Sequence, residues 1–141
     1  MAGYSGTPLA QKLGLKPGAR LMLGGEVPAG FAEALAPLPE GVRIRRWPED
    51  HDQGPADVIV YFTRSRAAFL ADLVGLSATL TPSGGLWIAW PKKSAKVATD
   101  VTEDAVREVA LPIGVVDNKV CAIDETWSGL RLVWRLSNRP R

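Results

Sequence analysis

The chain has 141 residues, enough for one domain with a buried core, and its 46% hydrophobic and 23% charged residues are ordinary for a globular protein. A net charge of +2 is too small to indicate a nucleic-acid or membrane surface by itself. Cys121 is the only cysteine and no apolar segment approaches the ~20 residues that span a bilayer, so we expect a cytoplasmic protein without an internal disulfide.

The first third of the chain predicts short helices alternating with strands. Thr7 and Pro8 are typical of a helix N-terminus, with threonine as the cap and proline in the first turn. Residues 19–23 (ARLML) predict a strand, and a helix is expected after Pro28. Residues 42–47 (VRIRRW) alternate apolar side chains with arginine, which indicates a half-buried strand at the edge of a sheet.

The centre of the chain predicts two strands that are covered on both faces. Residues 57–62 (DVIVYF) and 86–90 (LWIAW) are apolar without alternation, as in a parallel sheet with helices on each side. Between them, an amphipathic helix is expected from a cap at Ser65 to Leu80. Residues 81–85 (TPSGG) contain proline and paired glycines, and we expect them to form a tight turn after that helix.

The last third predicts a helix followed by a hairpin. The helix should begin at a cap formed by Asp100 or Thr102. Strands are expected over 115–123 and 130–136, with 124–129 as their connection, because these segments alternate or are bounded by turn residues. The crossover rule predicts that the first of these strands runs parallel to the central ones.

This order of elements predicts an α/β fold. We expect a small three-layer, Rossmann-like domain with a mostly parallel, twisted sheet of about six strands that ends in an antiparallel hairpin. The whole chain, 1–141, should form a single domain, with flexible ends at 1–6 and 137–141.

Two resemblances extend this prediction. Residues 56–73 (ADVIVYFTRSRAAFLADL) and 80–93 (LTPSGGLWIAWPKK) resemble the second half of a class I S-adenosylmethionine-dependent methyltransferase. Residues 3–15, 90–104 and 107–130 resemble a bacterial family catalogued as domain of unknown function 3052. Both resemblances imply a methyltransferase-like topology, here shortened by one strand–helix unit.

The chain departs from the methyltransferase pattern where those enzymes hold their cofactor. They end the first strand with an acidic residue and a Gly-x-Gly loop, whereas residues 21–30 (LMLGGEVPAG) have neither. The second strand ends in Arg46 and Trp47, with Glu49 and Asp50 only in the loop beyond it. We therefore expect no cofactor, and S-adenosylmethionine is the alternative.

The candidate binding residues follow from the predicted topology, because ligands of open parallel sheets bind beyond the carboxyl ends of the strands. The lysines there either form a solvated loop or bind an anion, and the tryptophan of the hairpin connection either covers the core or stacks on a ligand. The candidates are Gly24, Gly25, Thr63, Trp90, Lys92, Lys93, Asp124, Glu125 and Trp127.

The sequence predicts no catalytic residue and no metal site. His51 is the only histidine and lies in a charged loop, so a histidine-based nucleophile is poorly supported. Asp124 and Glu125 have no histidine or further carboxylates near them in sequence that would complete a set of metal ligands.

Three functions fit these patterns. The leading hypothesis is a non-catalytic methyltransferase-like domain that binds a small anionic ligand or a protein partner. The alternatives are a divergent S-adenosylmethionine-dependent methyltransferase and a nucleic-acid-binding protein that uses the loop from Lys92 to Lys96. We expect no membrane partner.

Overall fold

The computed structural model describes residues 8–135. Its helices are α1 (Leu9–Lys12), α2 (Phe31–Ala34), α3 (Arg66–Thr79) and α4 (Glu103–Ala110), with 3-10 turns η1 (Lys93–Ala95) and η2 (Leu111–Ile113). Its strands are β1 (Arg20–Gly25), β2 (Arg43–Trp47), β3 (Ala56–Phe62), β4 (Leu80–Pro91), β5 (Val115–Ala122) and β6 (Trp127–Trp134). The predicted cap Thr7, the predicted strand residue Leu136 and the predicted flexible ends lie outside the described residues.

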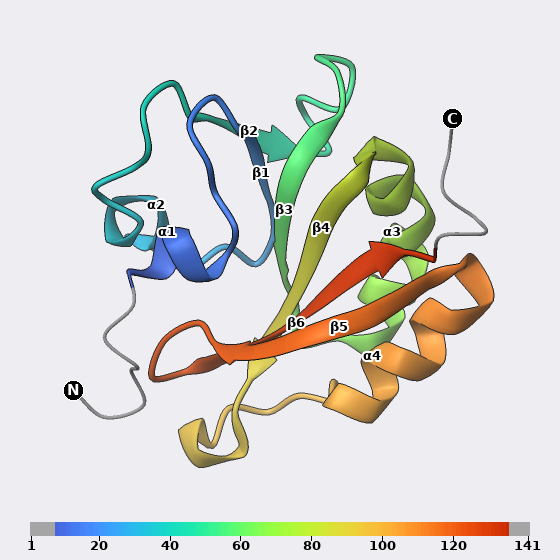
Figure 1. Cartoon of the computed structure of the whole chain (residues 1–141). Coiled ribbons are helices and arrows are strands. Elements are labelled where there is room, and N and C mark those ends of the chain that lie inside the picture. The colour runs from blue at the N-terminus through green and yellow to red at the C-terminus, as the bar shows by residue number, and fades with distance from the viewer. Residues whose placement is uncertain (1–7, 136–141) are drawn as a thin grey trace.

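The strands form one sheet in the order β2-β1-β3-β4-β6-β5 (Figure 1). Strand β1 pairs in parallel with β2 and β3, and β3 pairs in parallel with β4. Strand β6 is antiparallel to both β4 and β5, so β5 runs in the direction of the central strands, as predicted. The predicted α/β fold with a mostly parallel sheet and an antiparallel hairpin is confirmed.

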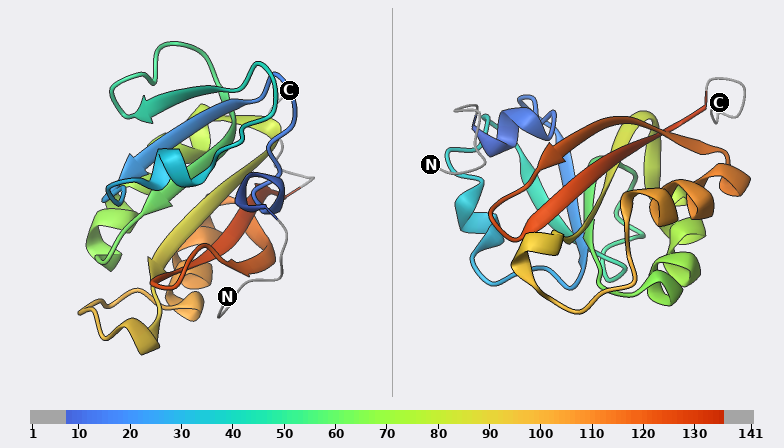
Figure 2. Two further views of the ribbon diagram at one scale, coloured as in Figure 1. Left: turned by 90° about the vertical axis from the view of Figure 1, so that its left-hand side faces the viewer. Right: turned by 90° about the horizontal axis from the view of Figure 1, so that it is seen from below.

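Helices cover both faces of the sheet, which gives three layers. Helices α1 and α2 lie on one face and α3 and α4 on the other (Figures 1 and 2). Successive side chains of β3 and β4 belong to two separate hydrophobic cores, one on each face of the sheet. Ile59 and Ile88 pack with α3 and α4, whereas Val60 and Trp87 pack with α1 and α2. None of the described helices is long and apolar enough to cross a bilayer.

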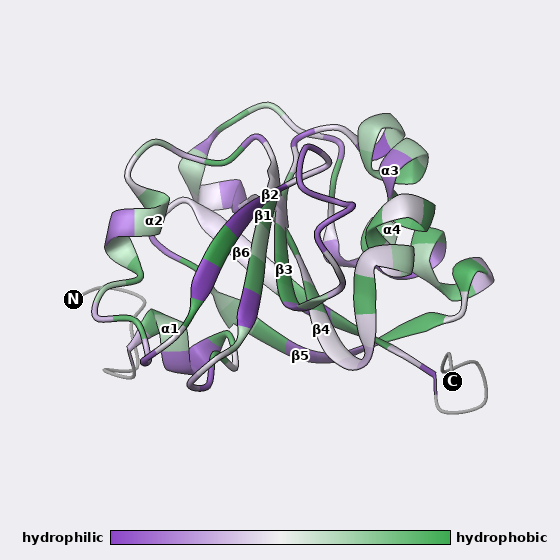
Figure 3. Ribbon diagram, turned by 90° about the horizontal axis from the view of Figure 1, so that it is seen from above, coloured by the Kyte–Doolittle hydropathy of each residue, from purple (hydrophilic) through white to green (hydrophobic). Residues whose placement is uncertain are grey.

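Strand β2 lies at the edge of the sheet, as its arginine alternation predicts. Its ribbon alternates between purple and green in Figure 3, whereas the central strand β3 is mostly green. The arginines solvate this edge and oppose pairing with a further strand.

Side-chain caps fix where the two long helices begin. The Ser65 hydroxyl accepts a hydrogen bond from the Ala68 amide (3.1 Å), which confirms the predicted cap of α3. Thr102 rather than Asp100 caps α4, because its hydroxyl accepts from the Ala105 amide (3.1 Å). Capping satisfies amides that the first helical turn leaves without intrahelical partners.

The predicted turn at 81–85 is wrong. Strand β4 already begins at Leu80, which pairs with Ala56, and the register then shifts so that Gly85 pairs with Val58. A side chain on Gly85 would overlap the guanidinium of Arg131, which lies across it. The glycines therefore allow close approach within an irregular strand rather than a chain reversal.

Two other predicted boundaries differ from the structure. The hairpin connection is shorter than predicted, because β6 starts at Trp127 and pairs with β4 from there. The helix predicted after Pro28 is the single turn α2. The helix ends at its C-cap Leu35, two residues before Pro37, which cannot continue a helix.

The indole of Trp87 attaches α1 to the sheet. Its Nε1–H donates to the Leu13 carbonyl (3.2 Å), and the side chain is 0% exposed. We predict that Trp87→Phe lowers the free energy of unfolding by about 2–4 kcal/mol, because it leaves a buried carbonyl unsatisfied and a small cavity.

Trp134→Phe is the matched control for this substitution. The Trp134 Nε1 is buried without a hydrogen-bond partner in the described part of the chain, so removing it loses no bond. We expect a loss below about 1 kcal/mol, with both variants measured by urea denaturation. Equal losses would contradict the role assigned to the Trp87 hydrogen bond.

Candidate functional site

The carboxyl ends of β1 and β3 meet where the chain reverses its direction of travel across the sheet. In open α/β sheets such a point forms the usual ligand crevice. Gly25 adopts a positive φ of 74°, and a side chain there would overlap the Phe62 carbonyl oxygen. The Glu26 amide donates to that same oxygen at 2.7 Å. The chain's own backbone therefore requires the glycine that the sequence suggested as a ligand contact.

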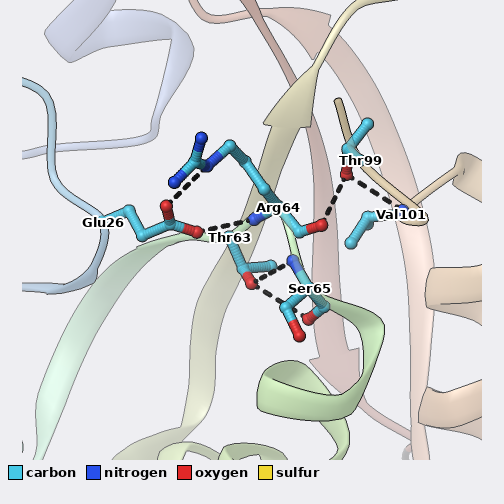
Figure 4. A network of polar contacts seen from close by, with 6 residues as sticks. All are labelled: Glu26, Thr63, Arg64, Ser65, Thr99 and Val101. Carbon is cyan, nitrogen blue, oxygen red and sulfur yellow. Dashed lines mark hydrogen bonds and ion pairs between the residues drawn. The ribbon is translucent and has the colours of Figure 1, made fainter. Parts of the chain in front are cut away.

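The side chain of Glu26 closes this crevice further. Its carboxylate accepts from the Arg64 amide (2.8 Å) and from Arg64 Nε (2.7 Å), as Figure 4 shows. The ion pair is partly exposed, so its Coulomb energy is modest, but the backbone contact makes it a fixed link between the two strand ends.

A second set of bonds connects β3 to the loop before α4. The Arg64 carbonyl accepts from the Thr99 hydroxyl (2.8 Å), which in turn accepts from the Val101 amide (3.0 Å) (Figure 4). Thr63, a predicted binding residue, is buried, and its hydroxyl bonds to the backbone of Ser65. These groups therefore form hydrogen bonds within the protein.

A pocket lies on the β2 side of this link. Its volume is about 380 Å³, and we call it the β1–β2 pocket. It is lined by Leu23, Gly24, Gly25, Val27, Arg46, Trp47, Pro48, Glu49 and Asp72. Two carboxylates, an arginine and an indole therefore surround a space at the ends of two parallel strands.

The Asp72 carboxylate is held in place from below the pocket. The Tyr61 hydroxyl donates to it at 2.6 Å. Burial, with the Asp72 carboxylate beside it, raises the pKa of Tyr61 well above its ordinary value, so the phenol stays a proton donor. Asp72 consequently remains an oriented acceptor, with lone pairs left for a ligand.

A second pocket lies on the other side of the link. Its volume is about 710 Å³, and we call it the β4–α4 pocket. It is lined by Trp90, Pro91, Lys92, Lys93, Val97, Thr99, Val101, Thr102, Glu103, Asp104 and Ser128. Trp90 is only 8% exposed, so it forms a largely apolar wall beneath the polar residues.

The lysines of the β4–α4 pocket lack ion pairs, whereas its carboxylates have them. Within residues 8–135 neither Lys92 nor Lys93 forms an ion pair. The carboxylates of Glu103 and Asp104, in contrast, both pair with Arg107, at 2.6 and 3.3 Å. The lysines are therefore the charges that remain free to meet a ligand.

The hairpin connection has a structural role. The Asp124 carboxylate accepts from the amides of Thr126 (2.8 Å) and Trp127 (2.7 Å), which closes a tight turn. Glu125 is exposed at its tip. Trp127 packs edge-on against Phe62, with ring centroids 5.1 Å apart, and so covers the core.

The predicted single site is thus two pockets separated by the Glu26–Arg64 link. Gly24 and Gly25 line one pocket, and Trp90, Lys92 and Lys93 line the other. Thr63, Asp124, Glu125 and Trp127 line neither of the two. The Lys92 amide does bond to the Thr126 carbonyl (2.8 Å), so the lysines and the hairpin connection meet as predicted.

Sequence reasoning missed the carboxylates of the β1–β2 pocket and the link itself. Glu26 and Arg64 are far apart in the chain, and no spacing rule connects them. Asp72 could have been found, because it is the one charged residue between Arg66 and Thr79 in an otherwise apolar helix.

Other reactive groups give no sign of a catalytic centre. No three His, Cys, Asp or Glu side chains within the described residues group as metal ligands. Burial raises the pKa of the Cys121 thiol, which favours the protonated and less nucleophilic form.

No protein-family model matches the chain, and no curated protein matches it. The resemblance to the family of domain of unknown function 3052 therefore stays a prediction.

Solved structures of methyltransferase type share the fold. Magnesium protoporphyrin IX methyltransferase (ChlM) from Synechocystis PCC 6803, with bound S-adenosylmethionine (SAM), has a TM-score of 0.55 and 12% identity over 90% of this chain and 74% of its own. Aeropyrum pernix fibrillarin, with natively bound SAM, has a TM-score of 0.56 and 15% identity over 93% of this chain and 70% of its own. These likenesses show that the chain has the methyltransferase-like fold.

A third solved structure matches less of its own length. LepI in complex with SAM has a TM-score of 0.51 and 12% identity over 92% of this chain, but the chain spans only 47% of LepI.

The expectation of no cofactor is corrected by this comparison. Solved structures with this fold contain SAM, which points to SAM as the ligand to consider. The absence of the Gly-x-Gly loop does not remove the binding space, because a pocket remains at the ends of β1 and β2. Its volume lies within the range of roughly 300–1,000 Å³ of small-molecule sites, and its carboxylates suit ribose hydroxyls, so its residues fit the nucleoside part of SAM.

Substitution of Gly25 tests how much the close contact between Gly25 and Phe62 contributes to stability. Gly25→Ala should lower the free energy of unfolding by about 3 kcal/mol or more, because it combines an unfavourable left-handed φ with a clash against Phe62. Gly30→Ala is the control, since Gly30 has a similar φ of 82° but nothing within 4 Å, and should cost only about 1–2 kcal/mol. Urea denaturation measures both, and identical losses would show that the contact with Phe62 is unimportant.

Proposed function

We propose that this domain binds SAM in the β1–β2 pocket and acts as a divergent SAM-dependent methyltransferase. The observation that carries the proposal is the place of this pocket at the carboxyl ends of two parallel strands, next to the point where the chain reverses direction. The likeness to SAM-bound structures supports SAM over other nucleotides.

The chemistry of the pocket residues supports this assignment. The carboxylates of Glu49 and Asp72 would accept hydrogen bonds from the ribose hydroxyls. The indole of Trp47 offers an aromatic surface for the adenine. The guanidinium of Arg46, which forms no ion pair within residues 8–135, would meet the carboxylate of the methionine part.

When bound, SAM supplies an electrophilic methyl group. We propose that the β4–α4 pocket, on the other side of the Glu26–Arg64 link, binds a second ligand and that this ligand is a small anion. Lys92 and Lys93 would bind its charge as compact, unpaired cations. The largely buried Trp90 would exclude water from one side of it, which strengthens the electrostatic attraction.

Calorimetry tests cofactor binding directly. We expect SAM, or its demethylated product, to bind the wild-type protein with micromolar affinity. Glu49→Gln should weaken this binding about tenfold or more, because a hydrogen bond to a charged group contributes about 1.5–3 kcal/mol.

Glu40→Gln is the matched control, since Glu40 is exposed and lies outside the lining of the pocket. Its affinity should equal that of the wild type. No measurable heat with either ligand at millimolar concentration would exclude the proposed cofactor, and equal weakening in both variants would exclude the proposed pocket.

The anion pocket is tested separately with inorganic phosphate. In an NMR titration we expect saturable shifts of the amide signals of Lys92, Lys93 and Ser128. The double substitution Lys92→Ala and Lys93→Ala should abolish them, because it removes the unpaired charges, whereas Lys16→Ala, at an exposed position outside the pocket, should not. Shifts that persist in the double variant would contradict the assignment.

A further inference from the structure

Helix α3 is apolar on both of its faces. Its inward residues Phe69, Leu73 and Leu76 are buried against the sheet. Its outward residues Ala67, Leu70, Ala71, Val74, Gly75 and Ala78 are exposed, and we call them the outer α3 face. Leu70 and Val74 are each 60% exposed. A helix that is hydrophobic all round is normally covered on all sides, so this face is suited to a partner.

The neighbours of α3 leave this face open. On one flank, Arg66 pairs with Glu108 of α4 at 2.9 Å. On the other flank, the ring of Trp47 lies against Gly75, with its Cζ2 atom 3.1 Å from where a side chain would begin. Asp72, the one charged residue of the helix after Arg66, accepts a hydrogen bond from the Tyr61 hydroxyl. Thus no charge interrupts the outer α3 face.

A groove continues the face at the C-terminal half of α3. It has a volume of about 740 Å³ and lies between Gly75 and Ala78 on the helix and Trp47, Pro48 and Asp52 on the other wall. Small residues on the helix side allow a second helix to approach closely, and the aromatic and proline rings supply an apolar wall.

The outer α3 face is complementary to itself. In a twofold pair of antiparallel helices, residue i meets residue j and residue j meets residue i. An axis near Val74 places the two Val74 side chains together and sets each Leu70 over Ala78 of the second copy. A large side chain thereby meets a small one beside the groove, which is the pattern of ridges packing into grooves.

The charges favour the same arrangement. Arg66 lies at the N-terminal end of α3, while the loop at its C-terminal end, residues 48–55, contains Glu49, Asp50 and Asp52 together with His51. One cation from outside meets this loop, the Arg45 guanidinium, which donates to the Gln53 carbonyl. Antiparallel packing brings Arg66 of one copy toward this acidic loop of the other, and it also opposes the helix dipoles favourably. Parallel packing would place like charges together.

We propose that the outer α3 face is the contact surface of a symmetric dimer, in which α3 packs antiparallel against α3 of a second copy of this chain. The 14 residues of α3 extend about 21 Å. A stable interface takes about 800 Å² from each partner, more than one helix face supplies, so the walls of the groove belong to the interface.

Sedimentation equilibrium across micromolar concentrations tests the dimer. The wild type should reach twice the chain mass of 15.1 kDa. Val74→Glu should remain monomeric throughout, because it sets two carboxylates face to face on the axis. Val120→Glu is the matched control, since Val120 is 50% exposed but lies on β5, and it should dimerise like the wild type. Circular dichroism checks that each variant is folded.

A cross-link tests the position of the axis. In a Cys121→Ser background, Val74→Cys should form a disulfide-linked dimer on mild oxidation, whereas Ala67→Cys should not, because only the residue on the axis meets its own copy within disulfide reach. A monomeric wild type at every concentration overturns the proposal. A dimer that survives Val74→Glu overturns it as well.

Discussion

The fold depends on the burial of two adjacent parallel strands on both of their faces. Ile59, Val60, Leu86 and Trp87 have no exposed surface, although successive side chains of each strand point to opposite sides. Hydrophobic burial on both sides requires a layer on both sides, so α3 and α4 must cover one face and the α1–α2 segment the other. The Trp87 indole then fixes the position of α1 through a hydrogen bond to Leu13.

The same two strands determine where a ligand can bind. Their side chains fill the interior, and both proposed ligand pockets lie at the carboxyl edge of the sheet. There the protein uses Gly25, Phe62 and the Glu26–Arg64 pair to join the ends of β1 and β3. This link divides the edge into two pockets, one with the unpaired Lys92 and Lys93 and one with Glu49, Asp72 and Arg46. A cationic cofactor and an anionic second ligand would each find the complementary charge.

The fold was predictable from sequence because the burial of a strand determines the pattern of apolar and polar residues along it. LWIAW and DVIVYF have no polar alternation, and VRIRRW has a clear one, so their central and edge positions follow from residue type alone. The error at 81–85 has an equally physical origin. Proline and glycine indicate a turn where the backbone reverses, but glycine also serves where another group lies across a strand, as Arg131 does over Gly85. Sequence alone does not distinguish the two uses.

The site was predictable only in outline. The topology placed Gly24, Trp90 and the lysines at one edge, since strand ends follow from strand order. The roles of Asp124 and Trp127 could not be assigned from the sequence. A carboxylate that bonds to the backbone of its own turn cannot be told by residue type from one that binds a ligand. Glu26 and Arg64 meet only through the pairing of β1 with β3. Contacts of this kind exist only once the sheet has formed.

Trp47 belongs to both proposed sites, the cofactor pocket and the dimer interface. It lines both the β1–β2 pocket and the groove beside α3. Its ring meets Tyr61 edge-on, with centroids 6.3 Å apart, and Tyr61 in turn holds Asp72. A second helix in the groove would therefore contact the ring that forms a wall of the cofactor pocket. Thermodynamic linkage requires that any effect of SAM on dimer affinity equal the effect of dimerisation on SAM affinity. The indole is the shared element through which such coupling would pass, because its ring lines both spaces.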